Sequence, residues 1–271
     1  AKRVIDYFVE EYKMGRTPNP CIRCNETIKF GLMLDKVLEM GADYLATGHY
    51  AKITTENGKY LLKAADSLKD QSYFLYRLNQ EQLSHVIFPI ADMEKKDTRA
   101  IARDLRIPVA DKGDSQEICF IPDNDYVKFI KEYSDFESLP GNFVDLNGNI
   151  IGKHNGIINY TIGQRKGLGV AFGEPMFVTK IDAKTNEVVL APNGFQETSE
   201  FLVDNLSKPF VSECKLDVKI RYKANKVPAT ITPMDNGKIK VTFDTPQRAV
   251  TPGQSAVFYD GDVVVGGGYI M

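Results

Sequence analysis

The sequence predicts an α/β region followed by a mostly β region, and three observations support this. Residues 1–120 alternate helical and strand patterns, which is typical of an α/β domain. From Asn142 onward, short β-type runs are separated by Asn-Gly or Asp-Gly turn signals. A chain of 271 residues with 43% hydrophobic residues is long enough for more than one core. We therefore expect several domains, the last of them a small antiparallel barrel.

Hydrophobic periodicity and turn residues define the expected elements. Asn25 is a plausible N-cap for a helix that Gly41 ends, and Asn57-Gly58 suits the turn of a hairpin. We expect helices over 25–40, 71–86, 94–105 and 123–133, strands over 42–47 and 118–121, and a hairpin over 50–64. Barrel strands are expected over 229–232, 238–243, 255–259 and 263–265. Boundaries near 123–135 and 192–202 give domains 1–127, 128–197 and 198–271.

Composition excludes several classes of protein. Lysine plus arginine (34) nearly balance aspartate plus glutamate (36), so any RNA site must be a local basic patch. No apolar run is long enough for a membrane span, and the amphipathic first residues are unlike a signal peptide. Four cysteines are too few for a disulfide scaffold, which favours a reducing, cytoplasmic setting. Because the chain opens within a helical pattern and without methionine, we expect it to be a fragment.

The segment from Gly15 to Asn25 is the most informative stretch. Two prolines stiffen the loop before Cys21 and Cys24, and we expect Cys24 at a helix N-terminus, where the helix dipole favours a thiolate. Arg23 adds positive charge nearby. A redox or sulfur-transfer role, half of a zinc site, and inert structural cysteines are all compatible with the Cys-x-x-Cys spacing.

Two further cysteines are candidates. Cys119, between Ile118 and Phe120, is by pattern a buried small hydrophobe or a second reactive thiol. Cys214 lies at the start of a strand pattern and is interpreted as structural.

Polar segments elsewhere suit RNA or nucleotide binding. Gly48-His49 directly follows a predicted strand, where ligands of α/β sheets bind, although a capping histidine in a tight turn fits equally. Asp70 precedes a predicted helix and could serve only as its N-cap. The basic loop over residues 160–169 and the pair Arg221-Tyr222 could contact an RNA backbone and stack on a base, or could be solvated surface.

Seven segments, in order along the chain, resemble the tRNA-specific 2-thiouridylases of the MnmA/TrmU family. They are GRTPNPCIRCNETIKF, GADYLATGHYAK, DSLKDQSYFLYRL, FPIADMEKKDTRAIA, DSQEICFI, YTIGQRKGLG and TPGQSAVFYDGDVVVGGGYI. The resemblance implies a PP-loop (adenine nucleotide α-hydrolase-like) domain, here partial, a small central domain and a C-terminal antiparallel β-barrel. It further implies a reaction in which ATP, presumed to act with Mg²⁺, adenylates the C2 oxygen of the wobble uridine at position 34, and a cysteine persulfide inserts sulfur.

The family's functional positions carry over residue by residue. Cys24 matches the nucleophilic cysteine and Cys119 the cysteine that carries the persulfide, and the resemblance implies a disulfide between them as sulfur is released. Asn19, Pro20 and Cys21 match the loop that contacts the target base, with Cys21 at a position that can hold aspartate in the family. Gly48 matches a nucleotide-binding glycine, and the tRNA-contacting positions match His49, Lys69, Asp70, Gln71, Arg221, Tyr222 and Gln254.

One family motif does not occur in the sequence. The Ser-Gly-Gly-x-Asp-Ser loop, whose backbone amides hold the ATP pyrophosphate, is absent. We therefore expect this chain alone to be unable to adenylate RNA. Two hypotheses follow: a tRNA 2-sulfurtransferase that acts with a cysteine desulfurase or sulfur carrier on tRNAs such as those for Glu, Gln and Lys, or a non-catalytic tRNA-binding remnant. A zinc-site protein that binds metal through Cys21 and Cys24 is a third.

Overall fold

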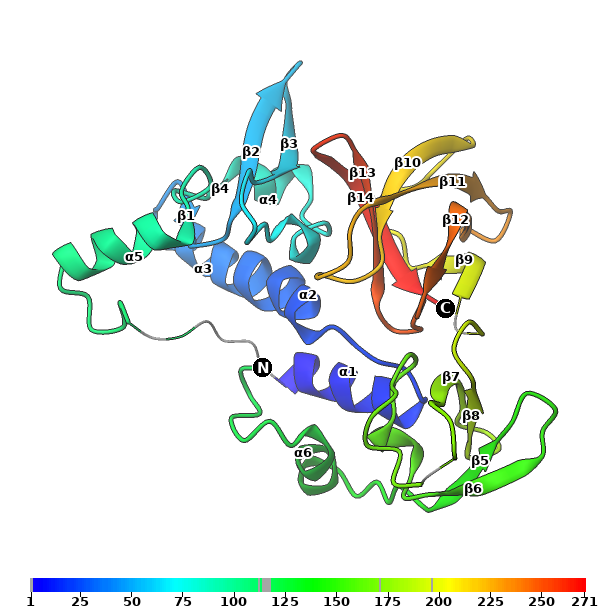
Figure 1. Ribbon diagram of the computed structural model, residues 1–271. Helices are drawn as coiled ribbons and strands as arrows, with labels where there is room; N and C mark the ends of the chain where they lie inside the picture. Colours follow the sequence, from blue (N-terminus) through cyan, green and yellow to red (C-terminus); the bar gives the residue numbers. More distant parts are fainter. Residues whose placement is uncertain (1, 112, 114–117, 171, 196) are drawn as a thin grey trace.

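The computed structural model describes residues 2–111, 113, 118–170, 172–195 and 197–271. Its α/β part packs against two β-rich parts, and the first helix lies between them (Figure 1). The α/β elements are α1 Lys2–Lys13, α2 Pro20–Cys24, the π-helix η1 Asn25–Met33, α3 Leu34–Glu39, β1 Leu45–Ala46, β2 Ala51–Glu56, β3 Lys59–Ala64, the 3₁₀ turn η2 Ser72–Phe74, α4 Gln80–Ser84, β4 Val86–Ile87 and α5 Lys95–Asp104. Strands β1 and β4 form a two-stranded parallel sheet.

The helix that was expected from Asn25 begins earlier. Asn19 is its extended N-cap residue and Pro20 occupies the first turn, where its missing N–H costs nothing. Asn25 is not an N-cap: it is buried, and its side-chain amide donates to the Phe74 carbonyl at 3.1 Å. The expectation of a helix N-terminus at Cys24 is therefore wrong, because Cys24 closes α2 more than one turn after the start.

The middle of this helical segment is a π-helix that contains a kink at Gly31. Gly31 has φ −99° and ψ −105°, and a Cβ atom there would lie 3.1 Å from the Glu26 carbonyl oxygen. A side chain would have to displace the backbone of the preceding turn, so the close approach explains glycine at this position.

Two other expected elements differ from the structure. The only helical elements in the segment 71–86 are η2 and α4, the latter with a capping box between Asn79 and Gln82, and strand β4 begins at Val86. Tyr73 and Tyr76 have their hydroxyls bonded to Ser255 of the barrel, so barrel packing overrides the helical pattern. Residues 118–121 form a turn in place of the expected strand, closed by a bond from Ile121 N–H to the Ile118 carbonyl. The β2–β3 hairpin, with its turn at Asn57-Gly58, is confirmed.

The central part is a four-stranded sheet covered by two helices. Strand order is β6-β5-β8-β7, with β5 and β8 parallel. Phe8 of α1 and Ile130 of α6 share one core with Phe143 of the sheet. The elements are α6 Tyr126–Tyr133, β5 Gly141–Val144, β6 Ile150–His154, the 3₁₀ turn η3 Ile157–Asn159, β7 Phe177–Asp182 and β8 Glu187–Ala191.

The C-terminal part is a closed antiparallel barrel, as expected. The order β13-β10-β11-β12-β9-β14 returns to β13, so six strands close on themselves. Strand β14 also pairs with β3 at Val263 and Lys63, which ties the hairpin of the α/β part to the barrel wall. The strands are β9 Glu197–Asp204, β10 Cys214–Lys219, β11 Val227–Pro233, β12 Ile239–Arg248, β13 Ser255–Asp260 and β14 Val263–Ile270. None of the helices in the described parts of the chain has the length and apolar character that a membrane crossing requires.

Candidate functional site

Three thiols, two from α2 and one from the distant 118–121 turn, lie within electrostatic range of one another. Cys24 is half-buried, Cys21 precedes it by one helical turn, and Cys119 is exposed in the 118–121 turn. Burial raises the pKa of both Cys21 and Cys24 most, and the charge of Cys119, an effect of short range, raises it further. All of them are free thiols, and Cys214, the fourth, starts β10 in the barrel as expected.

The exposure of Cys119 excludes one of its two interpretations from the sequence, and the reactive thiol stays a prediction. It is not a buried small hydrophobe, because its residue is exposed while the neighbouring Ile121 is only 2% exposed. The polar residues 114–117 that precede it lie outside the described residues.

The electrostatic environment of Cys24 differs from the sequence expectation. Burial raises its pKa most, and the nearby ammonium of Lys29 opposes this. Arg23 does not supply the positive charge that was expected beside the Cys24 thiol. It forms an ion pair with Glu26 at 2.8 Å and lies 5.9 Å from the ring centroid of Tyr7. Sequence reasoning missed Lys29, because only the π-helix brings a residue five positions on to the same face.

The barrel holds the loop that precedes the cysteines. Thr17 N–H donates to the Pro252 carbonyl at 2.9 Å, and the Gln254 amide donates to the Thr17 carbonyl at 2.8 Å. A Cβ atom on Gly253 would lie 3.0 Å from the backbone of Thr17, so the two loops are in close contact. Asn19 and Pro20 follow directly, which places the predicted base-contacting residues at the edge of the barrel.

Arg221 joins the barrel to the central part. One guanidinium nitrogen, Nη2, donates to the Ile162 carbonyl at 3.1 Å and to the Thr251 hydroxyl. Burial lowers its pKa, and its Nε atom has no partner among the described residues. Tyr222 packs against Phe74 with ring centroids 4.5 Å apart. Both predicted RNA contacts thus lie at the junction of the domains.

His49 lies in an apolar setting. It is 8% exposed between the rings of Phe30 and Phe88, at centroid distances of 5.6 and 5.8 Å. Its Nδ1 is 2.8 Å from the Thr47 hydroxyl, and burial followed by the charge of Lys29 lowers its pKa to about 4. A contact from this ring to RNA stays a prediction that its burial does not favour. The preceding Gly48 is exposed, just past β1.

The Lys69–Gln71 segment is organised by its own polar groups. Asp70 accepts bonds from Ala65 N–H and Ser72 N–H, each at 3.1 Å, and from the Ser72 hydroxyl at 2.9 Å. Gln71 exchanges bonds with the backbone of Tyr50, at 2.7 and 3.1 Å. Asp70 and Gln71 therefore shape the loop, while Lys69 is exposed.

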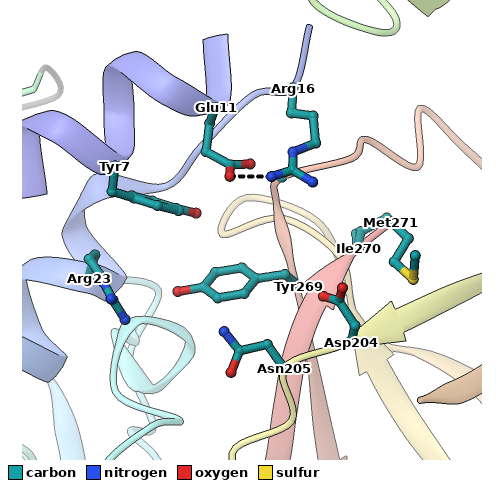
Figure 2. A pocket seen from close by; sticks show the side chains of 10 residues that line it. Tyr7, Glu11, Arg16, Arg23, Asp204, Asn205, Tyr269, Ile270 and Met271 are labelled. Atoms are coloured by element: carbon teal, nitrogen blue, oxygen red, sulfur yellow. Dashed lines mark hydrogen bonds and ion pairs between the residues drawn. The ribbon is translucent and has the colours of Figure 1, made fainter. Parts of the chain in front are cut away.

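A cavity of about 220 Å³ lies between α1 and the barrel (Figure 2). The hydroxyls of Tyr7 and Tyr269 are without hydrogen-bond partners among the described residues. Glu11 pairs with Arg16, and the charge of Asp204 helps raise the Glu11 pKa, although burial contributes most. The charges are balanced, so the cavity does not select one class of ligand. Its lining comprises Tyr7, Glu11, Arg16, Arg23, Asp204, Asn205, Gly253, Tyr269, Ile270 and Met271.

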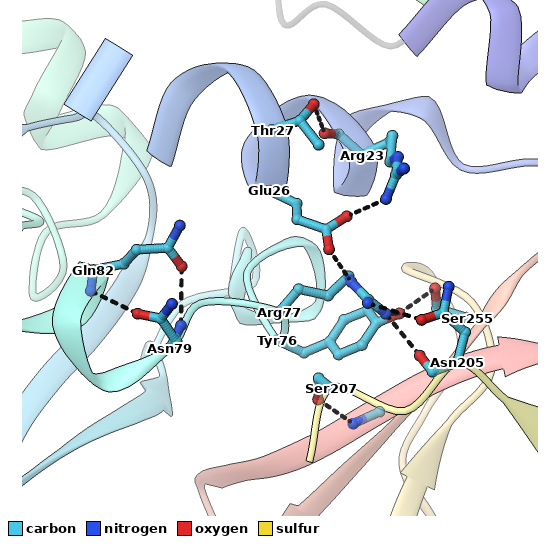
Figure 3. A network of polar contacts seen from close by, with 11 residues as sticks. Arg23, Glu26, Thr27, Tyr76, Arg77, Asn79, Gln82, Asn205, Ser207 and Ser255 are labelled. Atoms are coloured by element: carbon cyan, nitrogen blue, oxygen red, sulfur yellow. Dashed lines mark hydrogen bonds and ion pairs between the residues drawn. The ribbon is translucent and has the colours of Figure 1, made fainter. Parts of the chain in front are cut away.

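A polar network connects the helix of the cysteines to the barrel (Figure 3). Glu26 bridges Arg23 at 2.8 Å and Arg77 at 2.7 Å. Arg77 in turn donates to the backbone carbonyl of Asn205 at 2.9 Å. This network ties the helix that contains Glu26 to Arg77 and to the barrel. Sequence spacing gave no signal for it, because its partners are far apart in the chain.

Within the described residues, no group of three or more histidine, cysteine or acidic side chains is arranged to hold a metal ion. The zinc reading of Cys21 and Cys24 therefore gains no support from the part of the chain that the structure describes.

Family comparisons agree with this architecture. Residues 1–123 match a model described as a tRNA methyl transferase HUP domain. Residues 127–192 match a tRNA methyl transferase PRC-barrel domain, and residues 198–270 an aminomethyltransferase beta-barrel domain. Together they define a HUP-domain protein that carries two β-rich domains at its C-terminal side.

Curated relatives specify the family. A tRNA-specific 2-thiouridylase MnmA of Acetivibrio thermocellus is 56% identical over 100% of this chain and 77% of its own length. The MnmA proteins of Lachnoclostridium phytofermentans and Clostridium acetobutylicum are 50% and 51% identical over 99% of this chain and 77% of theirs. The chain belongs to the tRNA-specific 2-thiouridylase (MnmA) family.

Proposed function

We propose that this chain provides the sulfur-transfer centre and tRNA-binding surface of a cytoplasmic tRNA-uridine 2-sulfurtransferase. The gathering of Cys24 and Cys119 carries the proposal, because sulfur transfer between two cysteines requires their sulfur atoms to meet. Cys119 carries a persulfide on an exposed turn, where a cysteine desulfurase or a sulfur carrier can reach it. Cys24 is the nucleophile that the persulfide chemistry requires.

The substrate surface is proposed at the junction of the three parts. Asn19, Pro20 and Cys21 contact the target base from a loop that the barrel holds in place. Arg221, Tyr222 and Gln254 lie on the barrel side of the same junction. The substrates proposed are tRNAs with a wobble uridine, such as those for Glu, Gln and Lys.

The residues of this chain do not by themselves fit a complete ATP site. Gly48 past β1 is available to a nucleotide, but no Ser-Gly-Gly-x-Asp-Ser segment occurs in the sequence to hold its phosphates. We therefore propose that the family's ATP- and Mg²⁺-dependent adenylation is not performed by these residues alone. ATP-dependent thiolation of tRNA by this chain alone would overturn that statement.

Persulfide mapping tests the sulfur-transfer proposal. The chain is incubated with a cysteine desulfurase, cysteine and pyridoxal phosphate, and added sulfur is located by peptide mass spectrometry. The expected result is one added sulfur on the Cys119 peptide, lost as a Cys24–Cys119 disulfide forms. Cys24→Ser should retain the persulfide, Cys119→Ser should lack it, and the matched control Cys214→Ser should behave as wild type.

A non-catalytic tRNA-binding remnant is the second candidate, and the position of Arg221 and Tyr222 at the junction of the domains supports it. It predicts tRNA binding without any persulfide on Cys119. A gel-shift titration with wobble-uridine tRNA, run beside the sulfur mapping, separates the two candidates.

A further inference from the structure

Lys29 occupies a special position relative to the thiols. It is half-buried in η1 and follows Cys24 by five residues, the spacing of one π-helical turn. In an ordinary α-helix, neighbours on one face are three or four residues apart, so this spacing would turn Lys29 away from Cys24. The π-helix thus places an ammonium group over the face that carries the cysteines.

The charge of Lys29 is available to these thiols. Its charge lowers the pKa of Cys21, Cys24 and His49, so the ammonium lies within electrostatic range of all three. In the part of the chain that the structure describes, no carboxylate forms an ion pair with Lys29. A half-buried cation without a carboxylate favours an anionic neighbour, and a sulfur anion fits that requirement.

The other charged groups nearby do not replace Lys29. Arg23 is paired with Glu26 at 2.8 Å, and His49 stays neutral at physiological pH. Negative charge on Cys119 opposes ionisation of Cys24. The charge of Lys29 therefore opposes the increase in the Cys24 pKa that burial and the charge of Cys119 cause.

We propose that Lys29 is a positioning residue whose ammonium group stabilises the anionic sulfur of Cys24 during sulfur transfer. The proposal rests on the proposed role of Cys24 as the nucleophile. In that step, the Cys24 thiolate attacks the inner sulfur of the Cys119 persulfide. A Cys24–Cys119 bond forms, the bond to the outer sulfur breaks, and hydrosulfide leaves with the electron pair. Lys29 faces an anion before and after the step.

The pH dependence of Cys24 alkylation tests this role. The chain is treated with iodoacetamide at a series of pH values, and the rate at each cysteine is read after trypsin digestion. Trypsin cleaves after Arg23, so Cys21 and Cys24 fall on different peptides. Neither RNA nor a sulfur donor is needed, so this result is independent of persulfide mapping.

Charge removal should shift the Cys24 profile. Lys29→Gln and Lys29→Met are each expected to raise the midpoint by about one pH unit, the smaller end of the effect of one close opposite charge. Lys29→Met keeps an apolar stem of similar length, so that a packing defect in one variant does not decide the outcome. Lys29→Arg should remain close to wild type.

The matched control is Lys36→Gln. Lys36 lies in α3, the next helical segment, and is exposed and paired with Glu39 at 3.0 Å. It should leave the Cys24 midpoint unchanged. An unchanged midpoint in both Lys29→Gln and Lys29→Met, or an equal shift in Lys29→Arg or Lys36→Gln, would overturn the proposal.

Discussion

The barrel and the α/β region differ in how their structure is maintained. The barrel strands are six to ten residues long and close on themselves, whereas β1 and β4 have two residues each. Helix α5 buries none of its residues, and Tyr44, Leu105 and Val109 are more than half exposed nearby. Cys21 and Cys24 lie in the less regular region. The loop that precedes them is held by hydrogen bonds from the barrel to Thr17, one of them from Gln254.

The barrel is stabilised by its own hydrogen bonds, whereas the loop before Cys21 depends on contacts with another domain. A closed hydrogen-bonded wall has no free edges and tolerates little local opening. The loop before Cys21 has no such framework of its own, and it takes its shape from the wall of a distant domain. The stability of the barrel should therefore control the geometry of the loop that precedes Cys21.

Truncation in the barrel core should have the largest effect. Phe258 is fully buried and packs edge-on against Phe210 at a centroid distance of 5.3 Å. Phe258→Ala should cost about 3–5 kcal/mol in the free energy of unfolding, measured with urea. Ile101→Ala in α5, where the side chain is 48% exposed, should cost about 0.5 kcal/mol or less. Equal losses would contradict the comparison.

Acid should weaken the α/β region through His49. Its folded pKa of about 4 lies below the unfolded value, so the unfolded chain binds the extra proton between about pH 4 and 6.5. Stability should rise with pH across that window, by about 3 kcal/mol in total, and be complete above it. The barrel contains no histidine, which assigns the effect outside it.

His49→Gln should remove most of this slope in urea titrations at several pH values. A smaller slope of the same sign should remain, because burial also lowers the pKa of His154 in the central sheet. The pH-dependent difference between variant and wild type should vanish near pH 7.5, and persistence of the full slope in His49→Gln would exclude His49 as its source.

Loss of the hydrogen bond from Gln254 to Thr17, which we call the barrel clamp, should have a smaller effect than the two changes above. It should loosen only the loop at Thr17. Gln254→Ala removes the bond to the Thr17 carbonyl, worth about 1 kcal/mol. Amide hydrogen exchange at Thr17 should accelerate by about five- to tenfold, while exchange in β11 stays unchanged. Gln247→Ala, which removes only a local bond to the Thr245 carbonyl, is the control. Faster exchange in both variants would argue against a specific clamp.

Surface ion pairs should not distinguish the two regions. Lys215 pairs with Asp244 on the barrel at 3.6 Å, and Lys36 with Glu39 on α3 at 3.0 Å, with all four side chains well exposed. Lys215→Ala and Lys36→Ala should each change the free energy of unfolding by about 0.5 kcal/mol or less. A large loss in only one of them would show that surface charge contributes to the difference between the regions.

Elements set by local pattern could be predicted from the sequence. Four of the six barrel strands, β11 to β14, and the hairpin at Asn57-Gly58 follow from alternation and turn residues, and the structure has them where expected. Strand β9 was not among the expected strands, and of β10 only the start at Cys214 was expected. The 71–86 helix was wrong because Tyr73 and Tyr76 bond to Ser255, a partner that local periodicity cannot reveal.

The roles of the site residues stay predictions, whereas the environment expected around Cys24 can be compared with the structure. Family motifs named Cys24 and Cys119, and the structure brings their charges together. The expected help from a helix N-terminus and from Arg23 was wrong, because Pro20 begins the helix and Glu26 takes the guanidinium. The π-helical register that selects Lys29 depends on packing around Gly31, so it could not be read from composition or spacing.

The clamp between the loop at Thr17 and the segment Pro252–Gln254 has a consequence for biosynthesis. A ribosome makes the loop at Thr17 first. It makes the barrel residues that hold this loop, and the barrel-closing strand β14, more than two hundred residues later. In a nascent chain, the loop that precedes Cys21 and Cys24 therefore has not yet acquired its final shape. Contacts so distant in sequence form late in folding, so the loop before Cys21 reaches its final geometry only after translation has passed the barrel.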